Sequence, residues 1–311
     1  MSYIHKGVIS KTRLLISGLP NSGKTTSLST FIYGIYDYTN DDTANQHHDE
    51  KSERDYAIEY AIGKHMVIIT CPGEFGVKSL PIDTPHITSL YYEAGDSDDI
   101  NSPEWSAHAI AEFDAICTAT IKQKPDILAY DGLHSLWSHL MNRSTNGDYL
   151  SGVDLNVNPN TGRQDPYRSA KFYNQTHNNF GQYLAGIYTC AVPFVIATTW
   201  EEWESGKTEG EKPGDIASTR YLWPAIPGAM AKNVVGKFDA RVSARLEKRC
   251  CHQGCVDSKE SNDHYVWQFL PKNDVMGVGI KGIKRFNASM KQYPYVHQNW
   301  PALQKLIEVC T

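Results

Sequence analysis

The sequence predicts an α/β fold: a mostly parallel sheet between layers of helices, with an antiparallel extension towards the C-terminus. Three observations predict it. Short apolar runs alternate with longer helix-compatible segments, a glycine-rich loop follows the first of these runs, and alternating patterns replace them after residue 220. With 311 residues, 41% hydrophobic and 21% charged, the composition is that of a globular domain. We expect a single domain over residues 1–311, with its core at about 12–285 and a terminal helix at about 299–310.

Four apolar runs are the predicted parallel strands: TRLLISG at 12–18, HMVIITC at 65–71, DILAYD at 126–131 and PFVIATT at 193–199. Continuous runs of this kind are typical of strands whose two faces are both covered by helices. A helical stripe follows the first strand, with apolar residues at Leu28, Phe31, Ile32 and Ile35. Residues 105–121 and 171–190 are also helix-compatible, which completes a βαβα alternation and favours a parallel sheet.

The C-terminal part follows a different pattern. RVSARLEKR at 241–249 and HYVWQFLP at 264–271 alternate as antiparallel strands do, and we expect them to extend one edge of the main sheet. NWPALQKLIEVC, with an early proline, predicts the terminal helix. Three polar, breaker-rich segments, 37–55, 142–168 and 201–218, are predicted loops.

Composition limits the compartment and the partners. No apolar run approaches the roughly 20 residues that span a bilayer, and MSYIHKGVISK has no secretory-signal pattern. Seven scattered cysteines, an odd number, predict free thiols in a reducing compartment. We therefore expect a cytoplasmic protein without a membrane partner, in the host cytoplasm if a phage encodes it. The net charge of -5 argues against a uniformly basic surface for duplex DNA.

The stretch GLPNSGKTT at 18–26 matches the pattern G-x-x-x-x-G-K-[ST], between an apolar strand and an amphipathic helix. Glycines let successive backbone N–H groups face phosphates, and a helix N-terminus adds the positive end of its dipole. Lys24 is predicted to meet the β- and γ-phosphates. The predicted nucleotide-binding residues are Gly18, Leu19, Pro20, Asn21, Ser22, Gly23, Lys24, Thr25 and Thr26.

A magnesium ion is the predicted companion of the triphosphate. Its protein ligands are the Thr25 hydroxyl and Asp131, which ends the third apolar run. Mg²⁺ keeps several waters and needs few protein ligands. The alternative role for Asp131 is to cap the next helix.

Glycine, not glutamate, follows Asp131, so the group that activates water lies elsewhere in the chain. DILAYDGLHSLW resembles the Walker B strand and following helix of RecA-like P-loop ATPases. The order of the pieces is similar to phage-encoded RecA-like nucleotide-binding proteins, including the single-strand annealing group: the glycine loop, this segment, PFVIATTW, YLWPAIPGAMAKNVVGKFDARV and KNDVMGVGIKG. The resemblance covers residues 12–285; its glycine loop is highly specific and its later motifs are loose.

The resemblance implies roles for further residues. Glu74, in the turn after the second strand, polarises the attacking water, with Glu93 as a substitute. Lys24 and Glu74 are thus the expected catalytic residues. Thr198 or Thr199 senses the γ-phosphate. The loops after the third and fourth strands correspond to those that face a central DNA path. A surface glutamate is the alternative for Glu74.

Basic residues form two groups near the C-terminus: Lys232, Lys237, Arg241, Arg245, Lys248 and Arg249, then Lys281, Lys284 and Arg285. One or two of the first group are candidates for cationic fingers that reach a neighbour's γ-phosphate, or for nucleic-acid contacts. A solvated strand face is the alternative.

Two further patterns in the sequence are weaker. CCHQGC at 250–255 with His264 has metal-capable side chains but no paired C-x-x-C spacing, so we favour a reduced hairpin loop over zinc. Pro271-Lys272-Asn273-Asp274 departs from the guanine-reading motif of GTPases, which favours ATP over GTP.

These features together predict Mg²⁺-dependent ATP binding and hydrolysis in a homo-oligomeric ring or filament. The resemblance adds coupling to nucleic-acid handling, of the phage recombination or strand-annealing type, with single-stranded DNA as partner. The alternative is a nucleotide-dependent switch, or an assembly or packaging ATPase or GTPase that does not act directly on DNA.

Overall fold

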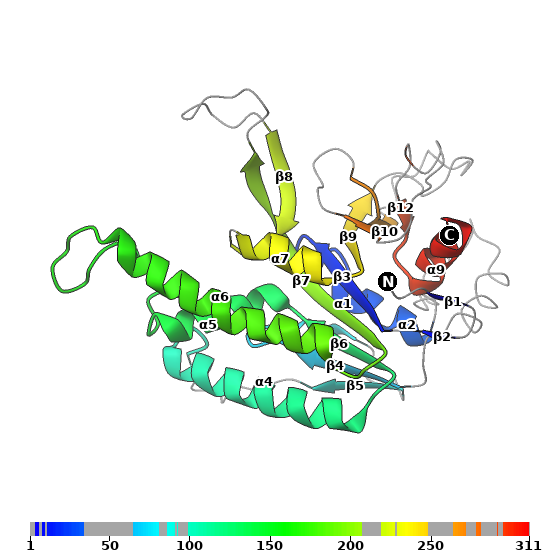
Figure 1. The fold of residues 1–311 in the computed structure, drawn as a ribbon, viewed down its shortest axis with the longest axis horizontal. Helices are drawn as coiled ribbons and strands as arrows, with labels where there is room; N and C mark the ends of the chain where they lie inside the picture. Colours follow the sequence, from blue (N-terminus) through cyan, green and yellow to red (C-terminus); the bar gives the residue numbers. More distant parts are fainter. Residues whose placement is uncertain are drawn as a thin grey trace.

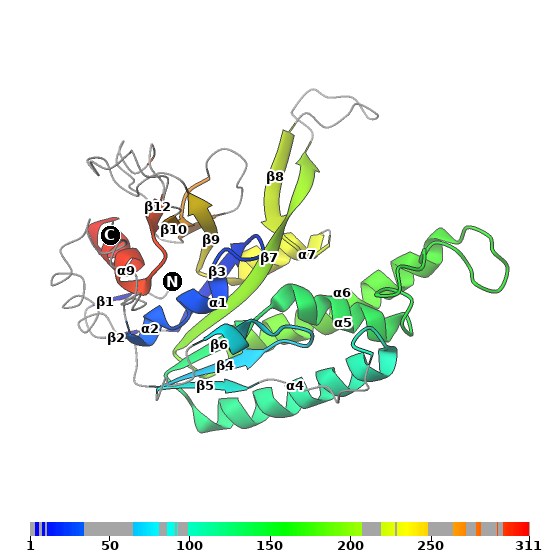
Figure 2. The same cartoon turned by 180° about the vertical axis from the view of Figure 1, so that it is seen from behind.

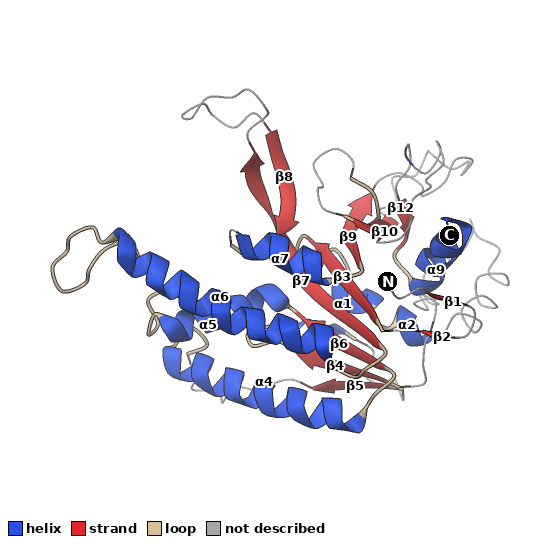
Figure 3. Cartoon of the chain, in the orientation of Figure 1, coloured by secondary structure: helices blue, strands red, loops and turns tan. Residues whose placement is uncertain are grey.

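The computed structural model describes residues 4–5, 8–9, 11–33, 65–80, 86–90, 92, 99–206, 219–227, 229–247, 264–271, 278–280, 291 and 295–310. Within this part the fold is α/β, with a mostly parallel sheet between helices, as the sequence predicts (Figures 1 and 3). The extent of the domain stays a prediction. None of the helices in these ranges is long and apolar enough to cross a membrane.

The main sheet has the strand order β12-β10-β9-β3-β7-β6-β4-β5. Its parallel part comprises β5 (Ile87–Leu90), β4 (Met66–Thr70), β6 (Ile127–Asp131), β7 (Phe194–Gly206), β3 (Thr12–Gly18) and β9 (Ala240–Glu247). The four apolar runs are therefore parallel strands, as predicted. Because β7 lies between β3 and β6, it separates the glycine-loop strand from the strand that ends at Asp131.

Antiparallel strands extend the sheet beyond β9. They are β10 (His264–Gln268), β11 (Gly279–Ile280) and β12 (Tyr295–His297). The prediction that the C-terminal strands extend one edge of the sheet is confirmed, since β10 pairs with β9 and β9 with β3. A separate two-stranded sheet is formed by β1 (Ile4–His5) and β2 (Val8–Ile9).

Apolar side chains bury both faces of the parallel strands. Leu15 of β3 packs in one core with α4 (Pro103–Gln123), α5 (Leu133–Ser144), α6 (Pro166–Thr189) and α7 (Ala229–Lys237). Leu14 and Ile16 pack in a second core with α2 (Thr30–Tyr33) and α9 (Trp300–Cys310). Successive strand residues point to opposite faces, which is why a continuous apolar run serves both cores. Figures 1 and 2 show the two helical layers from opposite sides.

The long helices begin and end near their predicted limits. Ser102 caps α4 by accepting the N–H of Trp105, and Asp165 caps α6 by accepting that of Tyr167. The terminal helix α9 is confirmed. The predicted loop at 142–168 is shorter than expected, because α5 continues to Ser144 and α6 begins at Pro166.

The helix predicted after the glycine loop is interrupted. It consists of α1 (Lys24–Ser27) and α2, with a turn at Leu28 and Ser29. The hydroxyls of Ser27, Ser29 and Thr30 donate to carbonyls three residues back, and the N–H groups of Leu28 and Ser29 also bond three residues back. These local bonds compete with the regular helical ladder. Leu28, Phe31 and Ile32 are nevertheless buried as predicted, and Ile35 lies outside the described residues.

The expected loop at 201–218 is wrong for its first residues. The strand β7 continues to Gly206 and pairs with β8 (Thr219–Pro224) in an antiparallel hairpin that projects from the body (Figure 1). Trp203 faces Leu222 across this pair, and such cross-strand apolar pairs stabilise a hairpin despite flanking glutamates. Residues 207–218 and the predicted loop at 37–55 lie outside the described residues.

Candidate functional site

A cavity of about 390 Å³ opens where the C-terminal ends of β3, β4 and β6 meet the middle of β7. Its wall combines the glycine loop with residues from distant parts of the sequence: Pro20, Asn21, Ser22, Gly23, Lys24, Thr25, Thr26, Glu74, Gly76, Asp131, Gly132, His134, Thr198, Trp200 and Tyr265. The structure thus brings most of the predicted nucleotide, metal and catalytic residues to one place. Gly18 and Leu19 do not line the cavity, but their carbonyl oxygens accept hydrogen bonds from Lys24.

The glycine loop turns sharply between β3 and α1. Asn21 and Gly23 have φ values of 62° and 76°, in the left-handed region. Gly18 leaves no room for a side chain, because a Cβ there would lie 2.5 Å from the carbonyl oxygen of Ala244. The loop therefore needs glycine at position 23 for its backbone conformation and at position 18 for its close approach to β9.

Lys24 points back into the loop. Its Nζ donates to the carbonyl oxygens of Gly18 at 3.0 Å and Leu19 at 2.8 Å. Burial lowers the pKa of Lys24 from its ordinary 10.5 to about 8, and the nearby carboxylates of Asp131, Glu74 and Glu201 partly oppose that shift. The ammonium is therefore held by weak neutral acceptors, which an anionic ligand would replace with stronger ones.

Asp131 ends β6 and accepts two hydroxyls. Thr25 donates to its Oδ2 at 2.9 Å, and Thr198 donates to its Oδ1 at 2.6 Å. Burial raises the pKa of Asp131, against the hydrogen bonds from Thr198 and Thr25. The intervening strand β7 thus ties the carboxylate into the sheet. Thr199 is buried, outside the cavity wall, so Thr198 is the threonine that the structure brings to the site.

The space beside Thr25 and Asp131 suits a small divalent cation. A Cβ on Gly76 would lie 2.8 Å from Oγ1 of Thr25 and 3.2 Å from Oδ2 of Asp131, so the glycine keeps that space free. Hydroxyl and carboxylate oxygens are ligands that Mg²⁺ accepts. No cluster of three or more His, Cys, Asp or Glu residues suited to a metal occurs in the described ranges. Thr25 and Asp131 would therefore share the ion with phosphate oxygens and water.

Glu74 lies in the turn after β4, opposite the glycine loop. Its Oε1 is 2.8 Å from Nε2 of His134, in the first turn of α5. His134 Nδ1 accepts the backbone N–H of Trp200 at 3.2 Å, and the two rings stack with centroids 4.1 Å apart. The predicted catalytic residue is thus in the cavity, held by a histidine and a tryptophan that sequence reasoning missed. The signal was present in DGLHSLW, where a histidine stands three residues after Asp131.

The antiparallel extension also reaches the glycine loop. Gln298, just after β12, donates through Nε2 to the carbonyl oxygen of Ser22 at 3.0 Å. Tyr265 of β10 lies on the cavity wall beside Gly23 and is 41% exposed. Sequence reasoning did not place these residues here, because the pairing of β10 with β9 and β12 decides where they lie.

Arg241, a predicted finger candidate, is buried and serves another purpose. Its Nη2 lies 2.8 Å from Oε1 of Glu201, and its Nε donates to the hydroxyl of Ser17. Ser17 and Ser243 both donate to the carboxylate of Glu201. A side chain 2% exposed cannot reach a neighbouring molecule, so the finger and solvated-face interpretations are both wrong for Arg241. The network instead joins β3, β7 and β9 under the glycine loop.

The other basic candidates that the structure describes do not line the cavity. Lys232 and Lys237 are exposed on α7, where Lys237 lies over the ring of Tyr188. Arg245 is half-buried on β9. The remaining predicted residues lie outside the described part of the chain: Glu93, Lys248, Arg249, Cys250, Cys251, Cys255, Lys272, Asn273, Asp274, Lys281, Lys284 and Arg285.

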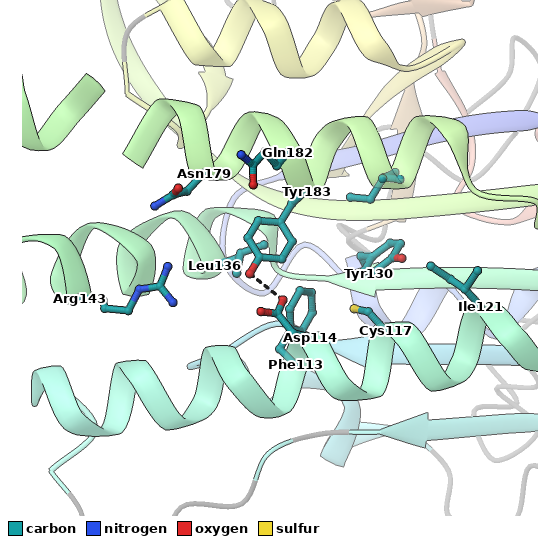
Figure 4. Close-up of a pocket in the computed structure, with 12 residues that line it drawn as sticks. Phe113, Asp114, Cys117, Ile121, Tyr130, Leu136, Arg143, Asn179, Gln182 and Tyr183 are labelled. Atoms are coloured by element: carbon teal, nitrogen blue, oxygen red, sulfur yellow. Dashed lines mark hydrogen bonds between the residues drawn. The ribbon is translucent and has the colours of Figure 1, made fainter. Parts of the chain in front are cut away.

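A second cavity, of about 400 Å³, lies between α4, α5 and α6 (Figure 4). The Tyr183 hydroxyl donates to Asp114 at 2.7 Å, and burial raises the pKa of Cys117 to about 12. Most of its wall is apolar, and none of the predicted site residues belongs to it. The cavity at the glycine loop is therefore the candidate functional site.

Comparison with known proteins adds no family assignment to this geometry. The side chains around the glycine loop are therefore the basis for inferring a function. No model of a known protein family matches the chain, and no curated protein matches it.

Proposed function

We propose that the protein is a RecA-like P-loop NTPase that binds Mg·ATP and hydrolyses it. One observation carries the proposal: Lys24 and Thr25 of the glycine loop share one cavity with Asp131 and Glu74, which come from two other strands. Phosphoryl transfer needs little covalent chemistry from the protein, and depends on positioning and charge stabilisation. The cavity has one group for each of these tasks.

The glycine loop binds the triphosphate. Asn21 and Gly23 have left-handed backbone conformations, which turn backbone N–H groups of the loop towards the phosphates. Lys24 exchanges the carbonyls of Gly18 and Leu19 for phosphate oxygens. The anion favours the charged form of Lys24, and this removes the cost that burial imposes on the ammonium.

Thr25 and Asp131 would hold a magnesium ion, in the space that Gly76 keeps free. A bound ion would neutralise negative charge on the phosphates. Thr198 keeps Oδ1 of Asp131 oriented by its hydrogen bond, and it accepts the N–H of Gly132 at 2.9 Å. The carboxylate is thus oriented by two hydroxyls, from Thr25 and Thr198.

Hydrolysis requires a water in line with the γ-phosphorus. The water oxygen forms a bond to phosphorus while the bond to the β–γ bridging oxygen breaks, and ADP leaves with that electron pair. Glu74 accepts a hydrogen bond from the water and takes its proton, so that ATP and water become ADP and phosphate. Lys24 stabilises charge on the transferred group.

Coupling to nucleic-acid handling, of the phage recombination or strand-annealing type, comes from the resemblance alone, as does assembly into a ring or filament. The buried state of Arg241 removes one candidate for a contact between subunits. A nucleotide-dependent switch that does not act on DNA is the competing proposal. Stimulation by single-stranded DNA distinguishes the two.

Phosphate release by the purified full-length chain tests the proposal, with Mg·ATP and with or without single-stranded DNA. Lys24→Ala should abolish turnover, whereas Lys122→Ala, a change of an exposed lysine in the last turn of α4, should leave it unchanged. Equal turnover in the wild type and Lys24→Ala would refute the ATPase. Turnover by a monomer that DNA does not stimulate would favour the switch.

A further inference from the structure

His134 makes two polar contacts, one at each ring nitrogen, that together assign where its proton lies. Its Nδ1 accepts the backbone N–H of Trp200 at 3.2 Å, so this nitrogen carries no hydrogen. The one N–H of the neutral imidazole is therefore on Nε2, which lies 2.8 Å from Oε1 of Glu74. The tautomer assigned by the Trp200 contact is the one that can donate to Glu74.

We infer that His134 is a positioning residue, which orients the carboxylate of Glu74 towards the attacking water. The inference rests on the proposed ATPase function. It concerns Oε1 of Glu74, which the imidazole holds; Oε2 is not part of that contact. A carboxylate fixed through one oxygen has a defined direction for its second oxygen, whereas an unsupported glutamate samples several rotamers.

The support for His134 is itself rigid. Its ring stacks on the indole of Trp200 at an interplanar angle of 24° and is almost fully buried. It belongs to the first turn of α5, three residues after Asp131. The imidazole is thus tied by a short piece of chain to the proposed metal ligand, and by a hydrogen bond to β7. Glu74 is consequently placed relative to Asp131, although the two come from different strands.

The same contact allows an opposite interpretation, in which His134 holds Glu74 away from water and restrains hydrolysis. The two interpretations predict opposite changes in kcat. Loss of an orienting partner lowers the rate, and a misplaced catalytic group costs on the order of 10- to 100-fold. Loss of a restraint raises it.

The test is a double-mutant cycle on the full-length protein, using His134→Ala, Glu74→Gln and both together. His134→Ala should lower kcat about 10- to 100-fold, with the affinity for Mg·ATP within about twofold of the wild type. In the Glu74→Gln background the same change should have little further effect, because His134 acts through Glu74. His134→Gln retains an N–H donor near the position of Nε2 and should recover part of the rate.

His177→Ala is the matched control. His177 also contacts a tryptophan ring, that of Trp137, in a tilted arrangement with centroids 5.0 Å apart, but it does not line the cavity. It should change thermal stability without a specific loss of kcat. Circular dichroism and the melting temperature of each variant separate loss of fold from loss of positioning.

The outcomes separate this inference from the function on which it rests. A wild-type protein without ATP turnover would defeat the proposed function and the inference with it. Wild-type turnover that is unchanged or faster in His134→Ala would defeat the inference alone. Multiplicative losses in the cycle would also overturn it, because they would show that His134 and Glu74 act independently.

Discussion

The side chain of Glu74 occupies the space beside Gly132 that a Cβ at position 132 would fill. A Cβ on Gly132 would lie 2.1 Å from Cγ of Glu74, and Gly132 has a φ of 94°. A side chain at position 132 would therefore both strain the backbone and displace the glutamate. The glycine that follows Asp131 and the glutamate that follows β4 are parts of one arrangement. This explains in steric terms why position 132 carries no acid of its own.

Gly132→Ala should lower kcat at least tenfold, because Glu74 must move to make room for the methyl group. The positive φ adds about 1–2 kcal/mol of destabilisation. Phosphate release and thermal unfolding measure the two effects. Gly152→Ala is the control, since Gly152 has a φ of 73° and nothing within 4 Å of the added methyl. Equal kcat in both variants would show that the space at Gly132 has no role in hydrolysis.

Thr198 and Thr199 are adjacent buried threonines with different surroundings. The Thr198 hydroxyl donates to Asp131 and accepts the N–H of Gly132, whereas no partner for the Thr199 hydroxyl occurs among the described residues. Thr198→Val should cost about 1–3 kcal/mol and weaken Mg²⁺-dependent turnover, because it leaves a buried N–H unpaired. Thr199→Val should be neutral or slightly stabilising. Denaturant unfolding of both variants compares them, and equal losses would contradict the assignment.

The sheet was predictable because its buried strands correspond to continuous apolar runs in the sequence. Strands buried on both faces have apolar centres, and the runs at 12–18, 65–71, 126–131 and 193–199 all contain one. Asp131 was predictable for the same reason, as the charge that ends such a run. Parallel strands align their C-terminal ends, so Lys24, Glu74 and Asp131 meet at one edge of the sheet.

Other features depend on pairing or on hydrogen bonds that a linear pattern does not record. The hairpin of β7 and β8 was not predicted, because a segment rich in glutamate and glycine has the composition of a loop. The pairing of Trp203 with Leu222, which stabilises the hairpin, is not visible in the linear sequence. Arg241 seemed to belong to an exposed basic strand, but its register beside β3 places it against Glu201. Gln298 reaches Ser22 from the far end of the chain, and only the tertiary fold brings the two together.

The lowered pKa of Lys24, about 8, predicts a pH dependence of nucleotide binding. Below that value Lys24 is charged before binding. Above it the free protein must first take up a proton, so the apparent Kd for Mg·ATP should rise, by up to tenfold per pH unit. For folding the sign is reversed. The unfolded chain binds the proton more readily between about pH 8 and 10.5, so the contribution of Lys24 to the free energy of unfolding increases with pH there.

Fluorescent-nucleotide titrations from pH 7 to 9.5 measure the change in the apparent Kd for Mg·ATP. A flat profile would contradict a phosphate contact by Lys24, and the rise should disappear in Lys24→Arg, which stays charged.

The buried pair of Glu201 and Arg241 should be more important for folding than for a contact between subunits. Glu201→Gln leaves the guanidinium buried without its counter-charge and should cost about 3–5 kcal/mol in the free energy of unfolding. Combining it with Arg241→Met removes the remaining charge. The new amide oxygen still accepts from one of the two serines, Ser17 or Ser243, and the amide NH2 can donate to the hydroxyl of the other, so the double variant should be more stable than Glu201→Gln alone. Urea unfolding measures this order.

Turnover in the same double variant decides whether Arg241 acts across a subunit boundary. Because Arg241 is buried beneath the glycine loop, its loss should reduce turnover only in proportion to unfolded protein. The assay therefore compares phosphate release per folded molecule with that of the wild type at a concentration where both are assembled. If a fully folded double variant loses its turnover, and mixing it with Lys24→Ala subunits restores activity, Arg241 would have to reach a neighbouring site, which its burial in this structure does not allow.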